Sequence, residues 1–91
     1  MNVRWSREAA DDLGAVFAHI RDDNPAAALR TVRNIYERVS ALKTFPNRGR
    51  EGRVNGTREL PLAPLPYIVV YRVLEETVEI VNIIHGARNW P

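Results

Sequence analysis

Large apolar residues recur at helical spacing near the start of the chain. They follow the i, i+3, i+4, i+7 pattern of one helix face: Leu13, Val16, Phe17 and Ile20. Ser6 precedes this stretch as a good N-cap, and the carboxylate of Glu8 lies in the first turn, where it complements the helix dipole. The pattern therefore predicts a helix from Arg7 to about Arg21.

A second apolar stripe follows a short polar break. In this break, Asp22-Asp23-Asn24-Pro25, Asn24 is a candidate N-cap, and Pro25 fits the first helical position, where its missing N–H costs nothing. The stripe comprises Ala28, Val32, Ile35, Val39 and Leu42. It predicts a helix from Pro25 to about Lys43. Two amphipathic helices with so short a connection are expected to pack as an antiparallel hairpin.

The pattern changes to that of β-strands in the second half. A glycine-punctuated loop at 47–53 precedes stretches of alternating or β-branched residues at 57–62, 67–73 and 77–84, and Val3–Trp5 predicts an edge strand. The order β-α-α-β-β-β predicts a single α+β domain over residues 1–91. In this fold an N-terminal helical hairpin packs on one face of a small antiparallel sheet. We expect the other face to be left for solvent or a partner.

Positive charge is concentrated in the middle of the chain. The net charge of the whole chain is +2, but residues 26–58 carry +6, and all basic residues except Lys43 are arginines. Arginine presents a planar fork that suits phosphate and carboxylate groups. The segment is interpreted either as a solvated helix face with a polar loop or as a surface for an anionic partner, nucleic acid or an acidic protein.

The composition gives no sign of a metal site, a cofactor or a membrane segment. The chain has no cysteine, and its two histidines are far apart in the sequence, so the sequence predicts no metal site and no cofactor. The N-terminal residues show no apolar targeting segment, and the longest uncharged run, Leu60 to Tyr71, is too short to span a bilayer. We therefore expect a cytoplasmic protein without membrane contact.

His85 ends the last predicted strand and is the first candidate for chemistry. It shares side-chain parity with Ile83, whereas Ile80 and Ile84 have the opposite parity. If Ile80 and Ile84 face the helices, His85 points to the open face, where its imidazole could move protons at neutral pH. The alternative is that it caps the strand end or fixes the C-terminal tail. His19, on a polar helix face, is expected to be solvated.

Two arginines are candidates to act with this histidine. Arg58 opens a predicted strand and Arg88 lies in the tail. Guanidinium groups around a phosphodiester can hold it and stabilise charge that develops during cleavage. The alternative for Arg58 is an ion pair with Glu59 or Glu79.

Further candidates for binding a macromolecular partner are Arg48, Arg50, Arg53, Tyr67 and Trp90. The three arginines lie in the loop before the sheet and could converge on the same side as Arg58. Tyr67 and Trp90 could stack on a base. The alternative for Trp90 is that it anchors the tail against the core.

Almost the whole chain resembles the RelE/ParE superfamily of bacterial toxins. The resemblance is carried by an ordered set of segments: Trp5 with Ala9-Ala10-Asp11-Asp12-Leu13, Asn24-Pro25-Ala26-Ala27-Ala28, Phe45-Pro46 with Gly49-Arg50, Gly56-Thr57-Arg58-Glu59-Leu60, Tyr67-Ile68-Val69-Val70-Tyr71-Arg72-Val73, and Ile84-His85-Gly86-Ala87-Arg88-Asn89-Trp90-Pro91. It implies a growth-inhibiting toxin held silent by a cognate antitoxin, which wraps an extended or helical segment around it. It further implies contact with operator DNA only indirectly, through the antitoxin.

The two branches of this superfamily differ in target. RelE-like members cleave messenger RNA on the ribosome. For such an activity the resemblance implies catalytic roles for His85 and Arg58, and we expect Arg88 to hold the phosphate together with Arg58. ParE-like members inhibit DNA gyrase. The tail of this chain has no tyrosine, and Lys43 is its only lysine, so the tyrosine and lysines of the RNA-cleaving type are missing. The long hairpin and the histidine-ended strand resemble the ParE branch, which the sequence favours narrowly over RNA cleavage.

Overall fold

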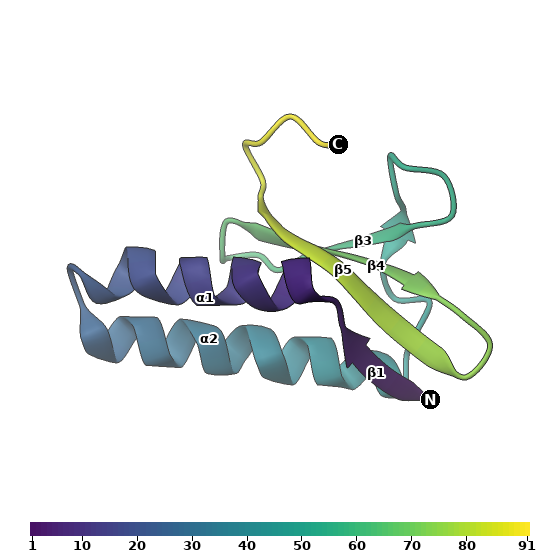
Figure 1. The fold of residues 1–91 in the computed structure, drawn as a ribbon, viewed down its shortest axis with the longest axis horizontal. Helices are drawn as coiled ribbons and strands as arrows, with labels where there is room; N and C mark the ends of the chain where they lie inside the picture. The colour runs from purple at the N-terminus through teal and green to yellow at the C-terminus, as the bar shows by residue number, and fades with distance from the viewer.

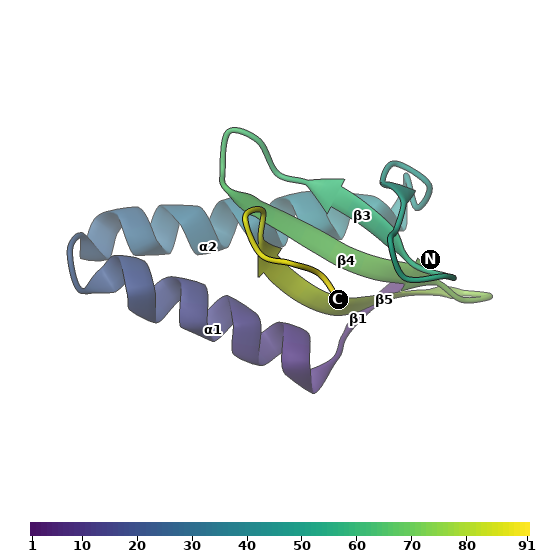
Figure 2. The same cartoon turned by 90° about the horizontal axis from the view of Figure 1, so that it is seen from above.

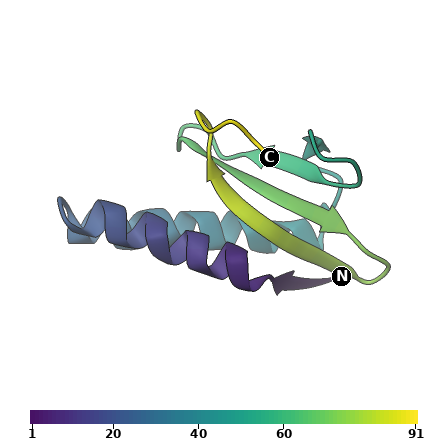
Figure 3. The same cartoon turned by 45° about the horizontal axis from the view of Figure 1, so that its top comes forward.

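The computed structural model describes residues 1–91 and shows two helices packed on one face of a five-stranded sheet (Figure 1). Its elements are β1 (Asn2–Trp5), α1 (Arg7–Arg21), α2 (Pro25–Ser40), the 3₁₀ turn η1 (Ala41–Lys43), β2 (Arg50–Glu51), β3 (Arg58–Pro61), β4 (Tyr67–Val73) and β5 (Thr77–His85). The predicted α+β fold is confirmed. The turn between the helices projects well beyond the strands (Figure 3).

Both helices begin where their capping residues predict. The side chain of Ser6 accepts a hydrogen bond from the N–H of Ala9 at 3.0 Å, and that of Asn24 accepts one from Ala27 at 3.0 Å. Each cap satisfies a backbone donor that the helix leaves free, a contribution of about 1 kcal/mol. The continuous helix predicted to Lys43 ends as an α-helix at Ser40 and tightens into η1.

The strand order is β1-β5-β4-β3-β2. The pairs among β2, β3, β4 and β5 are antiparallel, whereas β1 runs parallel to β5, with Asn2 opposite Thr77 and Trp5 opposite Ile80. The predicted strand at Val3–Trp5 is therefore an edge strand, as expected. The loop expected at 47–53 contains a short strand, β2, which pairs with the start of β3.

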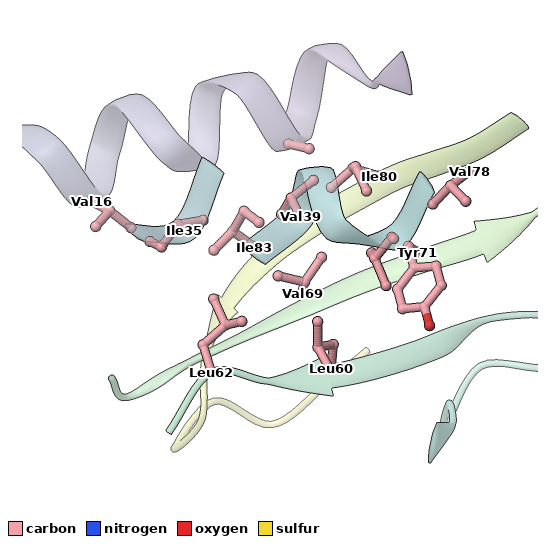
Figure 4. Close-up of a cluster of buried hydrophobic side chains, with 12 residues drawn as sticks. Val16, Ile35, Val39, Leu60, Leu62, Val69, Tyr71, Val78, Ile80 and Ile83 are labelled. Atoms are coloured by element: carbon pink, nitrogen blue, oxygen red, sulfur yellow. The ribbon is translucent and has the colours of Figure 1, made fainter. Parts of the chain in front are cut away.

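The main core fills the layer between the helices and the sheet (Figure 4). Its buried residues are Ala9, Val16, Ile35, Val39, Leu42, Leu60, Leu62, Val69, Tyr71, Val78, Ile80 and Ile83. Tyr71 is the largest of them, and its hydroxyl is satisfied inside the core. It donates to the carbonyl of Pro46 at 2.7 Å and accepts from the N–H of Gly49 at 2.8 Å. The loop after η1 is thereby tied to the sheet.

A β-bulge reverses the side-chain alternation of β5. Val70 pairs with Asn82 and Tyr71 pairs with Ile80, so Val81 has no residue opposite it. After the bulge, Ile83 joins the main core beside the helices, and Ile84 points to the other side of the sheet. The expectation that Ile84 faces the helices and His85 the open face is therefore wrong, because the extra residue shifts the parity of every residue that follows.

The face of the sheet opposite the helices is partly covered by the chain itself. Trp90, in the tail after β5, packs on a second apolar cluster formed by Ile68, Val70 and Ile84. Figures 1 and 2 show the tail folding back over β4 and β5 on the side away from the helices. Val70 is 0% exposed and Ile84 1%. The expectation that this whole face is left for solvent or a partner is wrong for the strip beneath Trp90.

Candidate functional site

Tyr67 and His85 form a pair of rings where β4 begins and β5 ends. The two residues are opposite one another in the sheet, and their rings meet edge to face, with centroids 5.8 Å apart and planes at 82°. The backbone N–H of Ala87 donates to Nδ1 of His85 at 3.1 Å, so Nε2 carries the proton in the neutral imidazole. We call this the ring pair. His85 is exposed, and its contact with Ala87 helps to fix the start of the tail.

Two hollows meet at the ring pair, and both include Tyr67 and His85 in their walls. The helix-side hollow has a volume of about 250 Å³ and is completed by Asp12, Ala15, Val16, His19 and Ile83. The tail-side hollow has a volume of about 380 Å³ and is completed by Arg50, Pro61, Ala63, Leu65, Pro66, Ile68, Gly86 and Ala87. They share these two residues, and we call the two hollows together the groove.

The wall of the helix-side hollow is held in place at the bulge. The carboxylate of Asp12 in α1 accepts hydrogen bonds from the side chain of Asn82 and the backbone of Ile83, both at 2.9 Å. The hydroxyl of Ser6 donates to the carbonyl of Val81 at 2.9 Å. These bonds satisfy polar groups of β5 beyond the part that β1 pairs, and they hold α1 against the strand.

Arg58 lies away from the ring pair. It pairs with Tyr71, four residues along β4 from Tyr67, which corresponds to roughly 13 Å at the usual rise of a strand. Its guanidinium donates to the carbonyl of Gly49 at 2.7 Å and thereby holds the loop that precedes β2. The structure therefore does not bring Arg58 together with His85, and neither Glu59 nor Glu79 is its ion-pair partner.

Arg50 and Arg53 share one buried carboxylate on the sheet face opposite the helices. Glu59 is 1% exposed and accepts three hydrogen bonds from Arg53 at 2.9–3.1 Å and one from Arg50 at 3.4 Å. The hydrogen bonds from Arg53, reinforced by Arg50, hold the pKa of Glu59 below its ordinary value although burial opposes this. Two guanidinium groups facing a single carboxylate leave this end of the sheet with a net positive charge.

A similar cluster lies on the same sheet face near the other end of β5. Glu79 bonds Arg4 at 2.8 Å and Arg72 at 2.7 Å, and these two partners lower the pKa of Glu79. Glu79 was considered from the sequence as a partner for Arg58, and the structure gives it to these other arginines instead.

The remaining candidates stack on aromatic rings. The guanidinium of Arg48 lies 4.6 Å from the ring centroid of Phe45, and that of Arg88 lies 5.6 Å from the ring of Trp90. Neither arginine has a carboxylate partner within ion-pair distance. Trp90 anchors the tail, which is the second of the two interpretations drawn from the sequence.

The predicted arginines do not converge on one site. Arg58 is on the helix side of the sheet, Arg50 and Arg53 are on the opposite side, and Arg48 is on the loop after η1. Sequence reasoning also missed the groove itself. Its helix-side wall comes from Ala15 and His19, which read as unremarkable surface positions on a polar helix face, and only the bulge in β5 brings Ile83 and His85 to them.

The helical hairpin packed on one face of a mostly antiparallel sheet can be compared with known structures. The structure is similar to a solved structure of the chromosomal ParDE TA system from P. aeruginosa, with a TM-score of 0.87, 34% sequence identity and coverage of 93% of this chain and 95% of that one. A family model described as the ParE toxin of the type II toxin–antitoxin system parDE matches residues 3–90. The chain therefore belongs to the ParE toxin family.

Two curated relatives are also named as toxins. The candidate toxin Y4kP of Sinorhizobium fredii is 43% identical over 89 residues, which cover 98% of this chain and 92% of the relative. Toxin RelE2 of Caulobacter vibrioides is 36% identical over 86 residues, which cover 94% of this chain and 96% of the relative. No helix of the structure is both long and apolar enough to cross a bilayer.

Proposed function

We propose that this toxin arrests growth by inhibiting DNA gyrase and that a cognate antitoxin silences it by binding. Membership of the ParE family and the likeness to a chain of a ParDE system support this proposal. A toxin that acts by binding a protein needs an exposed surface for the contact, and it does not need catalytic residues placed close together. The chain offers exposed arginines without a carboxylate partner, Arg48 and Arg88, for contacts of this kind.

The position of Arg58 is the observation that carries the choice of gyrase over messenger RNA. A ribonuclease of the type considered needs a proton-transfer group and a phosphate-holding cation on the same phosphodiester. His85 and Arg58 lie on the strands on either side of β4 and are offset along it by four residues, about 13 Å, and Arg58 donates to the carbonyl of Gly49. Arg88, which is near His85 in sequence, stacks on Trp90.

A supercoiling assay tests the proposal directly. Purified gyrase and relaxed plasmid are incubated with increasing amounts of the toxin, alone and after mixing with the antitoxin encoded by the neighbouring reading frame. We expect supercoiling to fall as toxin is added and to recover with antitoxin. Unchanged supercoiling at a large molar excess of folded toxin contradicts gyrase as the target.

Ribosome-dependent RNA cleavage is the alternative, because His85 is exposed and one relative is named RelE2. Primer extension on messenger RNA after induction of the toxin distinguishes it from gyrase inhibition. Under our proposal no new RNA ends appear, and His85→Gln arrests growth as wild type does. New ends that disappear in His85→Gln favour the alternative.

A further inference from the structure

The turn after η1 holds Phe45 and Arg48 side by side on the surface. The backbone N–H of Arg48 donates to the carbonyl of Phe45 at 3.2 Å, which closes a β-turn with Pro46 and Asn47 at its centre. The fixed backbone angle of proline suits the first of these central positions. The turn brings its first and last side chains together, and the guanidinium of Arg48 lies over the ring of Phe45, 4.6 Å from its centroid. We call these two residues the turn pair.

Side chains from the sheet clamp the backbone of this turn. The hydroxyl of Tyr71, a residue that is 0% exposed, bonds only to the carbonyl of Pro46 and the N–H of Gly49. The guanidinium of Arg58 donates to the carbonyl of Gly49 at 2.7 Å. A clamped turn has little conformational freedom left to lose when it binds a partner, so the turn pair is preorganised for a contact.

Both members of the turn pair are available to a partner. Phe45 is 53% exposed, more than any other large apolar side chain of the protein. The guanidinium of Arg48 is exposed and has no carboxylate within ion-pair distance. Its N–H groups therefore remain free for a planar acceptor such as a carboxylate. Aromatic residues and arginine are also the residue types enriched at protein interfaces.

The charges near the turn favour a protein over a nucleic acid. Lys43 is exposed and unpaired, but so is Glu51, and Arg50 is already bonded to Glu59. Binding to nucleic acid draws its affinity from several free cations that neutralise successive phosphates. The turn offers no such row of cations. A single carboxylate beside an apolar site matches Arg48 and its aromatic neighbour better.

The shape of the turn favours a folded partner. A hollow of about 400 Å³ at the turn is lined by residues 44–48 alone, so no other segment of the chain forms a wall around the turn pair. A projecting aromatic side chain needs a concave site on its partner, because the side chains that dominate binding fill pockets and are shielded there from water. A folded protein offers such a site, whereas a single extended or helical segment does not.

We propose that the turn pair is the contact of this toxin with its target protein. The ring of Phe45 enters an apolar pocket of a folded partner, and Arg48 pairs with a carboxylate at the edge of that pocket. The inference rests on the proposed function in taking gyrase as this partner. Burial of the ring supplies affinity, and the two-pronged pairing of the guanidinium with the carboxylate supplies specificity.

Substitutions in the turn pair test the contact. Binding of each variant to purified gyrase without DNA is measured by calorimetry. We expect Arg48→Glu and Phe45→Ala each to weaken binding by about tenfold or more, and Arg48→Lys to weaken it less than Arg48→Glu, because lysine keeps the charge but not the planar fork. Arg30→Glu is the matched control, at an exposed arginine of α2 without an ion pair, and should stay within about twofold of wild type.

Toxicity and antitoxin affinity in the same variants complete the test. We expect Arg48→Glu and Phe45→Ala to lose growth inhibition and to bind the antitoxin from the neighbouring reading frame as wild type does. Wild-type toxicity in both variants overturns the proposal. An equal loss of antitoxin affinity also overturns it, because the turn is then an antitoxin surface. If circular dichroism shows that Phe45→Ala does not fold, Arg48→Glu and Arg48→Lys decide the outcome.

Two competing occupants of the turn have readouts of their own. Fluorescence anisotropy with a DNA duplex and a single-stranded RNA measures binding to nucleic acid, and sedimentation measures self-association. If wild type binds either nucleic acid and Arg48→Glu does not, the turn is a nucleic-acid surface and the proposal is wrong. If wild type self-associates and Arg48→Glu is monomeric, the turn belongs to a second copy of the chain, which also overturns it.

The same measurements separate this inference from the proposed function. If wild type neither binds nor inhibits gyrase, but Arg48→Glu and Phe45→Ala lose toxicity with antitoxin affinity and nucleic-acid binding unchanged, the gyrase proposal fails and the turn pair remains the contact with another target protein. If wild type and both variants inhibit gyrase equally, gyrase remains the target and the turn pair is not the contact.

Discussion

The carboxylate of Asp12 in α1 accepts a hydrogen bond from the backbone N–H of Ile83 in β5 at 2.9 Å. The same oxygen accepts from the side chain of Asn82, so one carboxylate satisfies two donors just after the bulge. These bonds fix the angle at which α1 leaves the sheet and thereby shape the helix-side hollow.

Replacement of Asp12 is therefore expected to loosen this junction. Asp12→Ala leaves the N–H of Ile83 without a partner in a part-buried position, and we expect the free energy of unfolding to fall by about 1–3 kcal/mol. Asp12→Asn keeps an acceptor oxygen and is expected to lose less. Urea denaturation measures both values, with Asp11→Ala, an exposed neighbour, as the control. Equal stability of Asp12→Ala and wild type contradicts the role given to this bond.

The stability of the protein is expected to depend on the hydroxyl of Tyr71 as well as on its ring. In Tyr71→Phe the N–H of Gly49 and the carbonyl of Pro46 lose their common partner, and we expect a loss of about 1–3 kcal/mol. Hydrogen exchange should show faster exchange at the Gly49 amide in particular. Gly49→Ala is a second check, because a Cβ at this position would lie 2.8 Å from Cε1 of Tyr71 and force the ring or the loop to move.

Glu59 is expected to make stability depend on pH. Arg53 and Arg50 lower its pKa in the folded state from an ordinary value of 4.5, so as the pH falls the unfolded chain takes up the proton first. The stabilisation by this carboxylate is thus present above pH 4.5 and is lost as the pH falls through the folded-state pKa. Glu79, with its pKa lowered by Arg4 and Arg72, contributes in the same direction.

Glu59→Gln isolates the contribution of this residue. At neutral pH we expect the variant to be less stable by about 1–3 kcal/mol, because charge-assisted hydrogen bonds to Arg53 are lost. Between about pH 5 and about pH 3 its free energy of unfolding should change less than that of wild type. Parallel curves for the two proteins, measured by urea denaturation across this range, count against Glu59 as a source of the pH dependence.

Trp90 is expected to stabilise the fold through the packing of its ring and not through its N–H. Nε1 is buried and has no hydrogen-bond partner, whereas the ring packs on Ile68, Val70 and Ile84. Trp90→Phe keeps most of the apolar contact and removes the unpaired donor, so we expect stability within about 0.5 kcal/mol of wild type. Trp90→Ala should cost about 1–3 kcal/mol. Thermal unfolding of the two variants separates the contributions, and a large loss in Trp90→Phe argues for a polar role.

The helices could be predicted from the sequence because their signals are local. Ser6 and Asn24 cap the helices that follow them, and the stripes from Leu13 to Ile20 and from Ala28 to Leu42 have an unambiguous period. The antiparallel order of the central strands also followed from the sequence. These local signals determine which segments form helices and which form strands, and that the helices lie in a layer beside the sheet.

The site could be predicted only in part, because the face to which His85 points depends on one bulged residue in β5, Val81. The run from Val81 to Ile84 is apolar apart from Asn82, so alternation gives no sign that Val81 bulges. The side chain of His85 therefore could not be assigned to the correct face. The partners of Arg58 and Glu59 depend on how the 47–53 segment pairs along the edge of the sheet, which local patterns do not encode.

The parallel pairing of β1 with β5 has a consequence for synthesis of the chain. Arg4 and Glu79, bonded across this pair, are 75 positions apart, so the N-terminal strand has no partner until nearly all of the described residues have been made. A ribosome that is still translating β4 carries a hairpin and an unfinished sheet. Because the closing contacts are so distant in sequence, folding is delayed until β5 emerges. The sheet is therefore completed only after β5 has been made, and until then the paired edge of β5 is missing for β1.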